Sequence, residues 1–154
     1  MVEFALVGVP LVFILVSTAE MARGMWNYQT LAFSVRAGAR YASTHGKGCS
    51  GSCTVTVSNV AHSIAAAAVG LAPGNFNVVL TSATASPVSC TPLSNCYSNN
   101  TTWPPSADSA PGLDIRISGT YQFVSALSML WPGDGTVPFG TFTLGAWTRQ
   151  PIQF

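Results

Sequence analysis

Histidine and cysteine side chains are the residues of this sequence best suited to chemistry, and several of them lie close together. His45, Cys49 and Cys53 recur at intervals of four residues, and His62 follows further along. Imidazole nitrogens and thiolates are zinc ligands, so a zinc site is one interpretation. The spacing is not that of a short zinc knuckle, and we expect no metal at these residues.

The four cysteines form two close pairs, Cys49 with Cys53 and Cys90 with Cys96. Four cysteines allow three connectivities, of which we prefer the local pairing within each pair. Both pairs lie in stretches rich in Gly, Ser and Asn, "HGKGCSGSCT" and "SCTPLSNCYSNN", where a disulfide restrains segments that have few apolar residues. Because disulfides persist in oxidising compartments, the sequence predicts an extracytoplasmic location.

Groups suited to enzymatic catalysis are scarce in this chain. It has two histidines and five acidic residues, and neither histidine stands in a recognisable catalytic arrangement. The segment "GKGCSG" fits the nucleotide-binding spacing G-x-G-x-x-G, but it follows an expected helix rather than a strand. We therefore expect no catalytic residue, no cofactor and no enzymatic activity. A net charge of +1 without a Lys/Arg-rich patch also argues against a nucleic-acid partner.

The N-terminal stretch is uncharged from Phe4 to Ala19, and apolar residues continue as far as Trp26. A helix that crosses a bilayer needs about 20 apolar residues, so a short membrane span is expected here. A cleaved signal peptide is the competing interpretation, but it would have a basic region ahead of its apolar core, where this chain has Glu3. A carboxylate in apolar surroundings is unfavourable without an opposite charge, which makes Glu3 a candidate functional residue.

The basic residues Arg23, Arg36, Arg40 and Lys47 all follow the apolar stretch. By the positive-inside rule, this distribution would place the body of the protein in the cytoplasm, whereas the cysteines predict the opposite side. The two indications agree if a short basic leader preceded Met1 and was removed. We therefore expect a processed protein that was inserted with its N-terminus inside.

A single long helix is expected from the N-terminus to Ser43, because only Gly24 and Gly38 disfavour a helix after Met21. Pro10 should bend this helix. Glu20 and Arg23 share one helix face and can form an ion pair where the helix leaves the apolar zone.

Aromatic side chains recur along the same helix. We interpret them as interfacial anchors and as residues that pack against a sheet, rather than as an electron-conducting stripe. They are Trp26, Tyr28, Phe33 and Tyr41.

After residue 45 the pattern indicates a head of mixed structure. A second helix is expected over 58–71, with strands over 75–84, 113–123 and 141–151. Residues 85–112 are rich in Ser, Pro, Asn and Thr and should form a long surface loop. A period of two in the middle strand places one set of residues on a buried face: Leu113, Ile115, Ile117, Tyr121 and Phe123.

These elements predict an α+β fold in two parts. Residues 1–44 form the N-terminal hydrophobic stalk helix, and residues 45–154 form a disulfide-containing globular head with a short helix and an antiparallel sheet.

Three segments resemble the TadE-like pilus-assembly proteins, a type IV pilin-like family of the Tad secretion systems. They are "VEFALVGVPLVFILVSTAEMARG", "VRAGARYAS" and "LGAWTRQ". The resemblance is strong over residues 2–43 and weaker over residues 113–149. It implies a leader removed by a prepilin peptidase, a stay in the cytoplasmic membrane, and export by a pilus assembly platform. The product would be an extracellular filament of identical subunits on the cell surface, with cell adhesion as an associated role.

The resemblance also implies roles for particular residues. Glu3 would neutralise the N-terminal amine of a neighbouring subunit and set the axial register. The buried polymer core would contain Phe4, Leu6, Val7, Pro10, Leu11, Phe13 and Ile14.

Two departures from the family pattern leave alternatives open. Pilins usually have this acid at the fifth position, whereas Glu3 is third. The major pilins of Tad systems are usually much shorter, which favours a minor pseudopilin. A membrane-anchored, exported binding domain that never polymerises is the remaining alternative.

Overall fold

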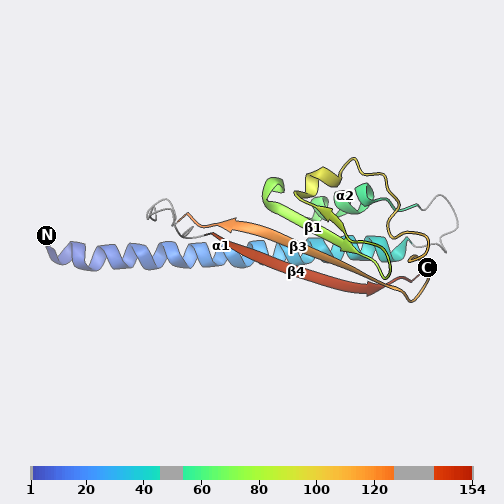
Figure 1. The fold of residues 1–154 in the computed structure, drawn as a ribbon. Helices are drawn as coiled ribbons and strands as arrows, with labels where there is room; N and C mark the ends of the chain where they lie inside the picture. The colour runs from blue at the N-terminus through green and yellow to red at the C-terminus, as the bar shows by residue number, and fades with distance from the viewer. Residues whose placement is uncertain (1, 46–53, 127–140, 154) are drawn as a thin grey trace.

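The structure, a computed structural model, describes residues 2–45, 54–126 and 141–153, and it confirms the α+β class (Figure 1). A long N-terminal helix lies beside an antiparallel sheet, and a second, short helix covers the same face of the sheet. The elements in chain order are α1 (Val2–Thr44), α2 (Val57–Ala67), η1 (Pro73–Asn75), β1 (Phe76–Thr81), β2 (Val88–Cys90), η2 (Leu93–Cys96), β3 (Asp114–Val124) and β4 (Thr141–Pro151).

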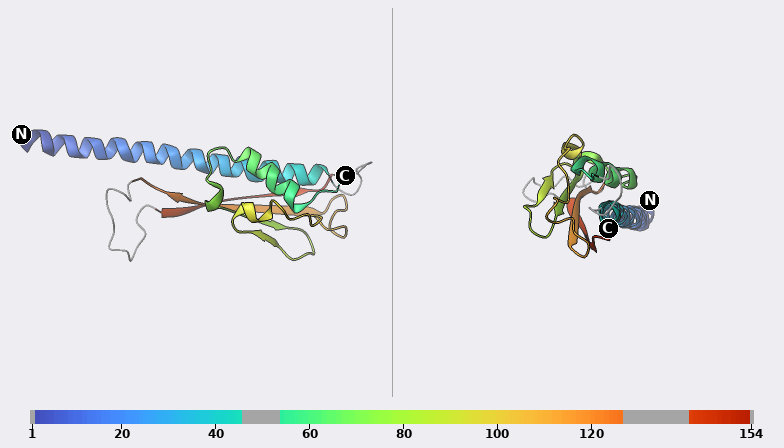
Figure 2. Two further views of the ribbon diagram at one scale, coloured as in Figure 1. Left: turned by 90° about the horizontal axis from the view of Figure 1, so that it is seen from above. Right: turned by 90° about the vertical axis from the view of Figure 1, so that its right-hand side faces the viewer.

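Helix α1 has 43 residues, a length of about 65 Å at 1.5 Å per residue. It continues through Pro10 without interruption. Its N-terminal half extends beyond the sheet, whereas its C-terminal half lies along it (Figure 2). In the C-terminal half Leu31, Val35, Ala39 and Ala42 are completely buried, so one helix forms both the projecting stalk and part of the core of the head.

The sheet has four antiparallel strands in the order β2-β1-β3-β4. The expected alternation in β3 is present, since Ile115, Ile117, Tyr121 and Phe123 are buried beneath the helices. The opposite face is open to solvent, and Arg116 lies on it.

Helix α2 is shorter than expected. Thr56 caps its first turn by accepting a hydrogen bond from the Asn59 amide, and the helix ends at Ala67 rather than near Leu71. The reason lies in the turn that follows, where Gly70 has a φ of 85°. This left-handed conformation favours glycine and ends the helix before Pro73.

The expectation of a surface loop over residues 85–112 is wrong. This segment contains β2, which pairs with β1, and the 3₁₀ helix η2. Leu93, Cys96 and Trp103 from the same segment are buried in the core. These buried apolar residues are widely spaced among polar ones, so they form no recognisable pattern. A strand of three residues is also too short to show a period of two.

Asp108 holds this segment to the turn after β1. Its carboxylate accepts hydrogen bonds from the hydroxyl and amide of Thr84 and from the amide of Ala85. The nearby Ser82 hydroxyl, then the Thr84 hydroxyl and these amides, hold the pKa of Asp108 far below its ordinary value. A completely buried carboxylate is thus kept ionised by polar groups rather than by a cation.

Candidate functional site: the apolar helix and its adjoining groove

The first half of α1 exposes a continuous apolar surface. Its large side chains are between 57 and 73% exposed, and they are Leu6, Val7, Val9, Leu11, Val12, Phe13, Ile14 and Leu15. By length and composition, α1 is able to cross a membrane. An apolar surface of this extent marks a lipid or protein contact, and the helix therefore indicates membrane anchoring.

The residues expected to act in assembly all lie on this projecting part of α1. Glu3 lies in the first turn with its side chain exposed. Pro10 is exposed as well. The side chain of Phe4 and the amine of Met1 lie outside the described residues, so the role of Glu3 toward an amine stays a prediction.

Glu20 and Arg23 join the stalk to the head. Glu20 Oε1 lies 3.2 Å from Arg23 Nη1, as their spacing on one helix face predicts. Glu20 Oε2 also accepts a hydrogen bond of 3.1 Å from the Ala126 amide, and Arg23 Nη2 donates one of 3.1 Å to the Val124 carbonyl. These links to the end of β3 span more than 100 residues of sequence, and local spacing could not reveal them.

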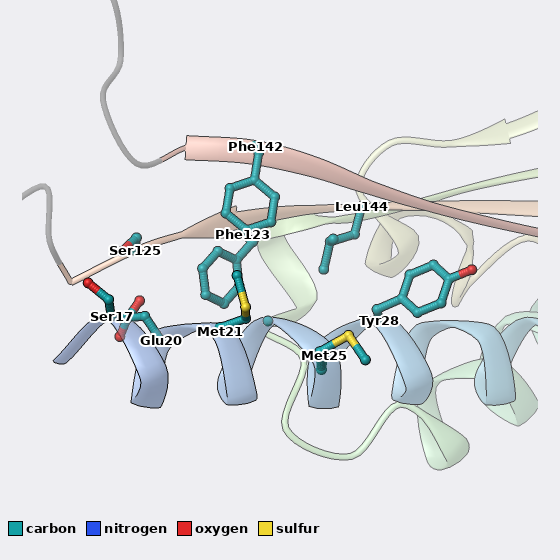
Figure 3. Close-up of a pocket in the computed structure, with 10 residues that line it drawn as sticks. Ser17, Glu20, Met21, Met25, Tyr28, Phe123, Ser125, Phe142 and Leu144 are labelled. Atoms are coloured by element: carbon teal, nitrogen blue, oxygen red, sulfur yellow. The ribbon is translucent and has the colours of Figure 1, made fainter. Parts of the chain in front are cut away.

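An apolar groove lies beside this junction, between α1 and the adjacent ends of β3 and β4 (Figure 3). Its volume is about 530 Å³. Met21, Gly24, Met25 and Tyr28 line it from α1, while Phe123, Phe142 and Leu144 line it from the strands; Ser17, Glu20 and Ser125 complete the lining. The groove therefore begins where the exposed apolar part of α1 ends.

Aromatic packing forms part of the lining of the groove. The rings of Phe123 and Phe142 lie 4.7 Å apart between centroids, and the Arg23 guanidinium lies 5.0 Å from the Phe123 ring centroid. Methionine side chains adapt their shape to different partners, so Met21 and Met25 suit a surface that receives another apolar segment.

The structure corrects the interpretation of the stalk aromatics. Trp26 and Phe33 are 67% and 64% exposed, so neither packs against the sheet. Nε1 of Trp26 lies near Gly70 instead, 3.9 Å from the place that a Cβ atom at Gly70 would take. Tyr28 lines the groove, and Tyr41 is partly buried and stacks on His45 with ring centroids 4.5 Å apart.

Cys90 and Cys96 form a disulfide, with Cα atoms 5.5 Å apart. Cys49 and Cys53 lie outside the described residues. Of the residues considered for zinc, His45 stacks on Tyr41, and His62 is exposed and stacks on Tyr97 with centroids 4.7 Å apart. Both rings thus have a local packing role within the described part of the chain.

The fold and site define a class of protein: an α+β head carried on an N-terminal helix that can anchor it in a membrane. The family comparison agrees with the resemblance seen in the sequence, because residues 1–40 match the family model described as TadE-like protein. The N-terminal helix is thus TadE-like, which indicates involvement in the assembly of Tad pili. TadE-like pilus proteins are structural proteins rather than enzymes. Comparison with curated proteins and with solved structures finds no match.

Proposed function

We propose that this protein is a pilin-like structural subunit that polymerises through its N-terminal helix into an extracellular Tad-type filament. Before assembly the helix holds the protein in the cytoplasmic membrane, where a prepilin peptidase and a pilus assembly platform act on it. The observation that carries the proposal is the pairing of an exposed apolar helix with an apolar groove in one molecule.

The exposed helix needs apolar surroundings at every stage. Burial of a large apolar side chain contributes about 2 kcal/mol, and eight such side chains lie exposed between Leu6 and Leu15. Lipid covers them while the protein is in the membrane. After the helix leaves the membrane, neighbouring subunits cover these side chains, because exposing them to water is unfavourable.

The groove gives the helix a place to pack on the next subunit. Phe13 and Ile14 of one subunit enter the groove formed by Met21, Met25 and Phe142 of another. The two surfaces differ, so the contact is heterologous, and repetition without closure gives an open helical filament rather than a ring.

Glu3 supplies the polar element of this otherwise apolar contact. Its carboxylate pairs with the N-terminal amine of a neighbouring subunit and sets the axial register. An apolar interface alone specifies register weakly, whereas a buried charge strongly disfavours any arrangement that leaves it unpaired.

Substitution of Glu3 separates a polymerising subunit from a simple membrane anchor. Glu3→Gln removes the charge while keeping the shape, and Glu3→Asp keeps the charge. For a polymerising subunit, Glu3→Gln lowers the yield of sheared filaments without reducing the amount in the membrane, and Glu3→Asp retains part of the yield. For a non-polymerising anchored domain, both variants stay in the membrane and neither wild type nor variant is released by shearing.

A further inference from the structure

A second candidate site lies on the open face of the sheet, opposite the face that α1 covers. Strand register places Thr81, Arg116 and Arg149 in one row across β1, β3 and β4. Ser118 and Trp147 form the next row. This row lies toward the end of the sheet near the C-terminus, away from the N-terminal end of α1 (Figure 1).

The arginine pair is unfavourable for the sheet itself. Like charges directly opposite each other on neighbouring strands are destabilising. Arg149 is compensated by an ion pair with Asp114. The Arg116 guanidinium instead lies 5.0 Å from the Trp147 ring centroid, and it has no carboxylate partner among the described residues.

A cavity of about 500 Å³ opens at this point. Arg116, Arg149, Asp114 and Trp147 line it together with Thr81, Ser82, Ala83, Gly112 and Leu113. The volume lies within the usual range for small-molecule sites, about 300 to 1,000 Å³. Polar and aromatic groups from three strands thus converge on one space large enough for a small ligand.

Ser82 adds a hydroxyl to the lining of the cavity. The residue is 7% exposed, and its hydroxyl lies close enough to the Asp108 carboxylate to lower the pKa of that carboxylate. Because a hydroxyl can accept as well as donate, Ser82 can accept a hydrogen bond from a ligand hydroxyl while it faces Asp108.

We propose that this cavity binds an acidic saccharide, whose carboxylate pairs with Arg116 and whose ring packs against Trp147. The planar guanidinium can bind a carboxylate through two parallel hydrogen bonds. Trp147 is 64% exposed, which leaves apolar surface for the C–H face of a sugar ring. The hydroxyls of Thr81 and Ser82 and the carboxylate of Asp114 match the donors and acceptors of sugar hydroxyl groups.

The charges favour a sugar acid over a polyanion. The site has two arginines and one aspartate, a net charge of +1, so only one cation is available to a ligand. The several negative charges of a phosphate chain would be repelled by the carboxylate of Asp114. The site lies on the other side of the sheet from the helix, so it extends the proposed function without depending on polymerisation.

Calorimetric titration of the full chain in detergent tests this proposal directly. The probes are a trimer with one galacturonic acid unit and two galactose units and a neutral trimer of galactose, with sodium sulfate and a short thymidine oligonucleotide as further anions. We expect binding of the acidic trimer that is about tenfold or more tighter than binding of the neutral one, the difference of one charged hydrogen-bonded pair.

Variants then assign the binding to this cavity. Arg116→Gln and Trp147→Ala should each weaken binding of the acidic trimer by about tenfold or more. Arg36→Gln removes an exposed cation from α1 and should leave binding unchanged, while thermal melting verifies that each variant is folded. Equal binding of both trimers, binding by sulfate or the oligonucleotide at the same affinity, no binding at all, or an unchanged Arg116→Gln variant would each overturn the proposal.

Discussion

Gly38 of α1 lies directly against Ile64 of α2, so closely that a Cβ atom at position 38 would overlap the isoleucine side chain. The two helices meet here above Ile117 of β3, whose Cδ1 would lie 3.7 Å from the same Cβ. A glycine that disfavours a helix by about 1 kcal/mol is therefore retained where the second helix needs the space.

Replacement of this glycine tests the packing of stalk against head. Gly38→Ala should destabilise the protein by about 1 to 2 kcal/mol, because overpacking outweighs the gain in helix propensity. Gly24→Ala is the matched control in the same helix, since its Cβ would meet only ring atoms at 3.8 and 4.0 Å. Thermal melting in detergent should show a lower midpoint for Gly38→Ala alone, and equal midpoints would contradict the packing described.

Asp108 should make the stability of the head dependent on pH. Its pKa is lowered in the folded protein, so its contribution is present above the unfolded pKa of about 4 and is lost as pH falls below that value. Asp108→Asn should lower the melting temperature at pH 7 and flatten its decline between pH 5 and pH 2. Asp114→Asn, which alters an exposed ion pair, should leave the acid decline in place. An unchanged acid decline in Asp108→Asn would show that other groups cause it.

The Cys90–Cys96 disulfide should stabilise the segment that was expected to be a loop. For a closed loop this short, the chain-entropy model gives about 2 kcal/mol. A double Cys90→Ala and Cys96→Ala variant should therefore unfold at lower denaturant concentration, by a similar free energy. Peptide mapping without reduction should recover the 90–96 linkage from wild type, and recovery of either cysteine joined to Cys49 or Cys53 would contradict the structure.

The sequence predicts the long helix and the two long strands, because each has a sustained hydrophobic pattern. It misses β2, whose three residues are too few for a pattern, and it places the end of α2 too late because the Ala-rich run continues past Ala67 without a stop signal before Gly70. The groove could not be predicted at all, since it combines Met21 and Met25 with Phe123 and Phe142. Only the pairing of α1 with the far ends of β3 and β4 brings these residues together.

The stalk junction should protect the end of β3 from local opening. Glu20→Ala removes the acceptor of the Ala126 amide and the partner of Arg23, so the Ala126 amide should exchange its hydrogen faster. Because the Arg23 side chain is 51% exposed, the ion pair contributes little and global stability should change little. Hydrogen exchange read by NMR in detergent provides the measurement, with Arg36→Gln as the control, and unchanged exchange at Ala126 would mean that the hydrogen bond does not persist in solution.

The groove should contribute to assembly more than to folding. Met25→Glu places a carboxylate at the lining of the groove, on a side chain that is 59% exposed in the single chain. Melting of the detergent-solubilised protein should therefore be preserved, while filament yield falls because a neighbouring apolar helix would bury the new charge. Gln29→Glu adds the same charge on an exposed part of α1 outside the groove lining and should have the smaller effect. Equal yields from the two variants would contradict a contact in the groove.

Polymerisation of this chain through its N-terminal helix can be tested directly on cells. Cells that express it should be sheared, the released material imaged by electron microscopy, and its protein identified by mass spectrometry. Polymerisation predicts filaments in which this chain is the dominant component and in which the helices of neighbouring subunits pack together. Filaments built mainly from another protein, or a chain that remains entirely in the membrane fraction, would contradict it.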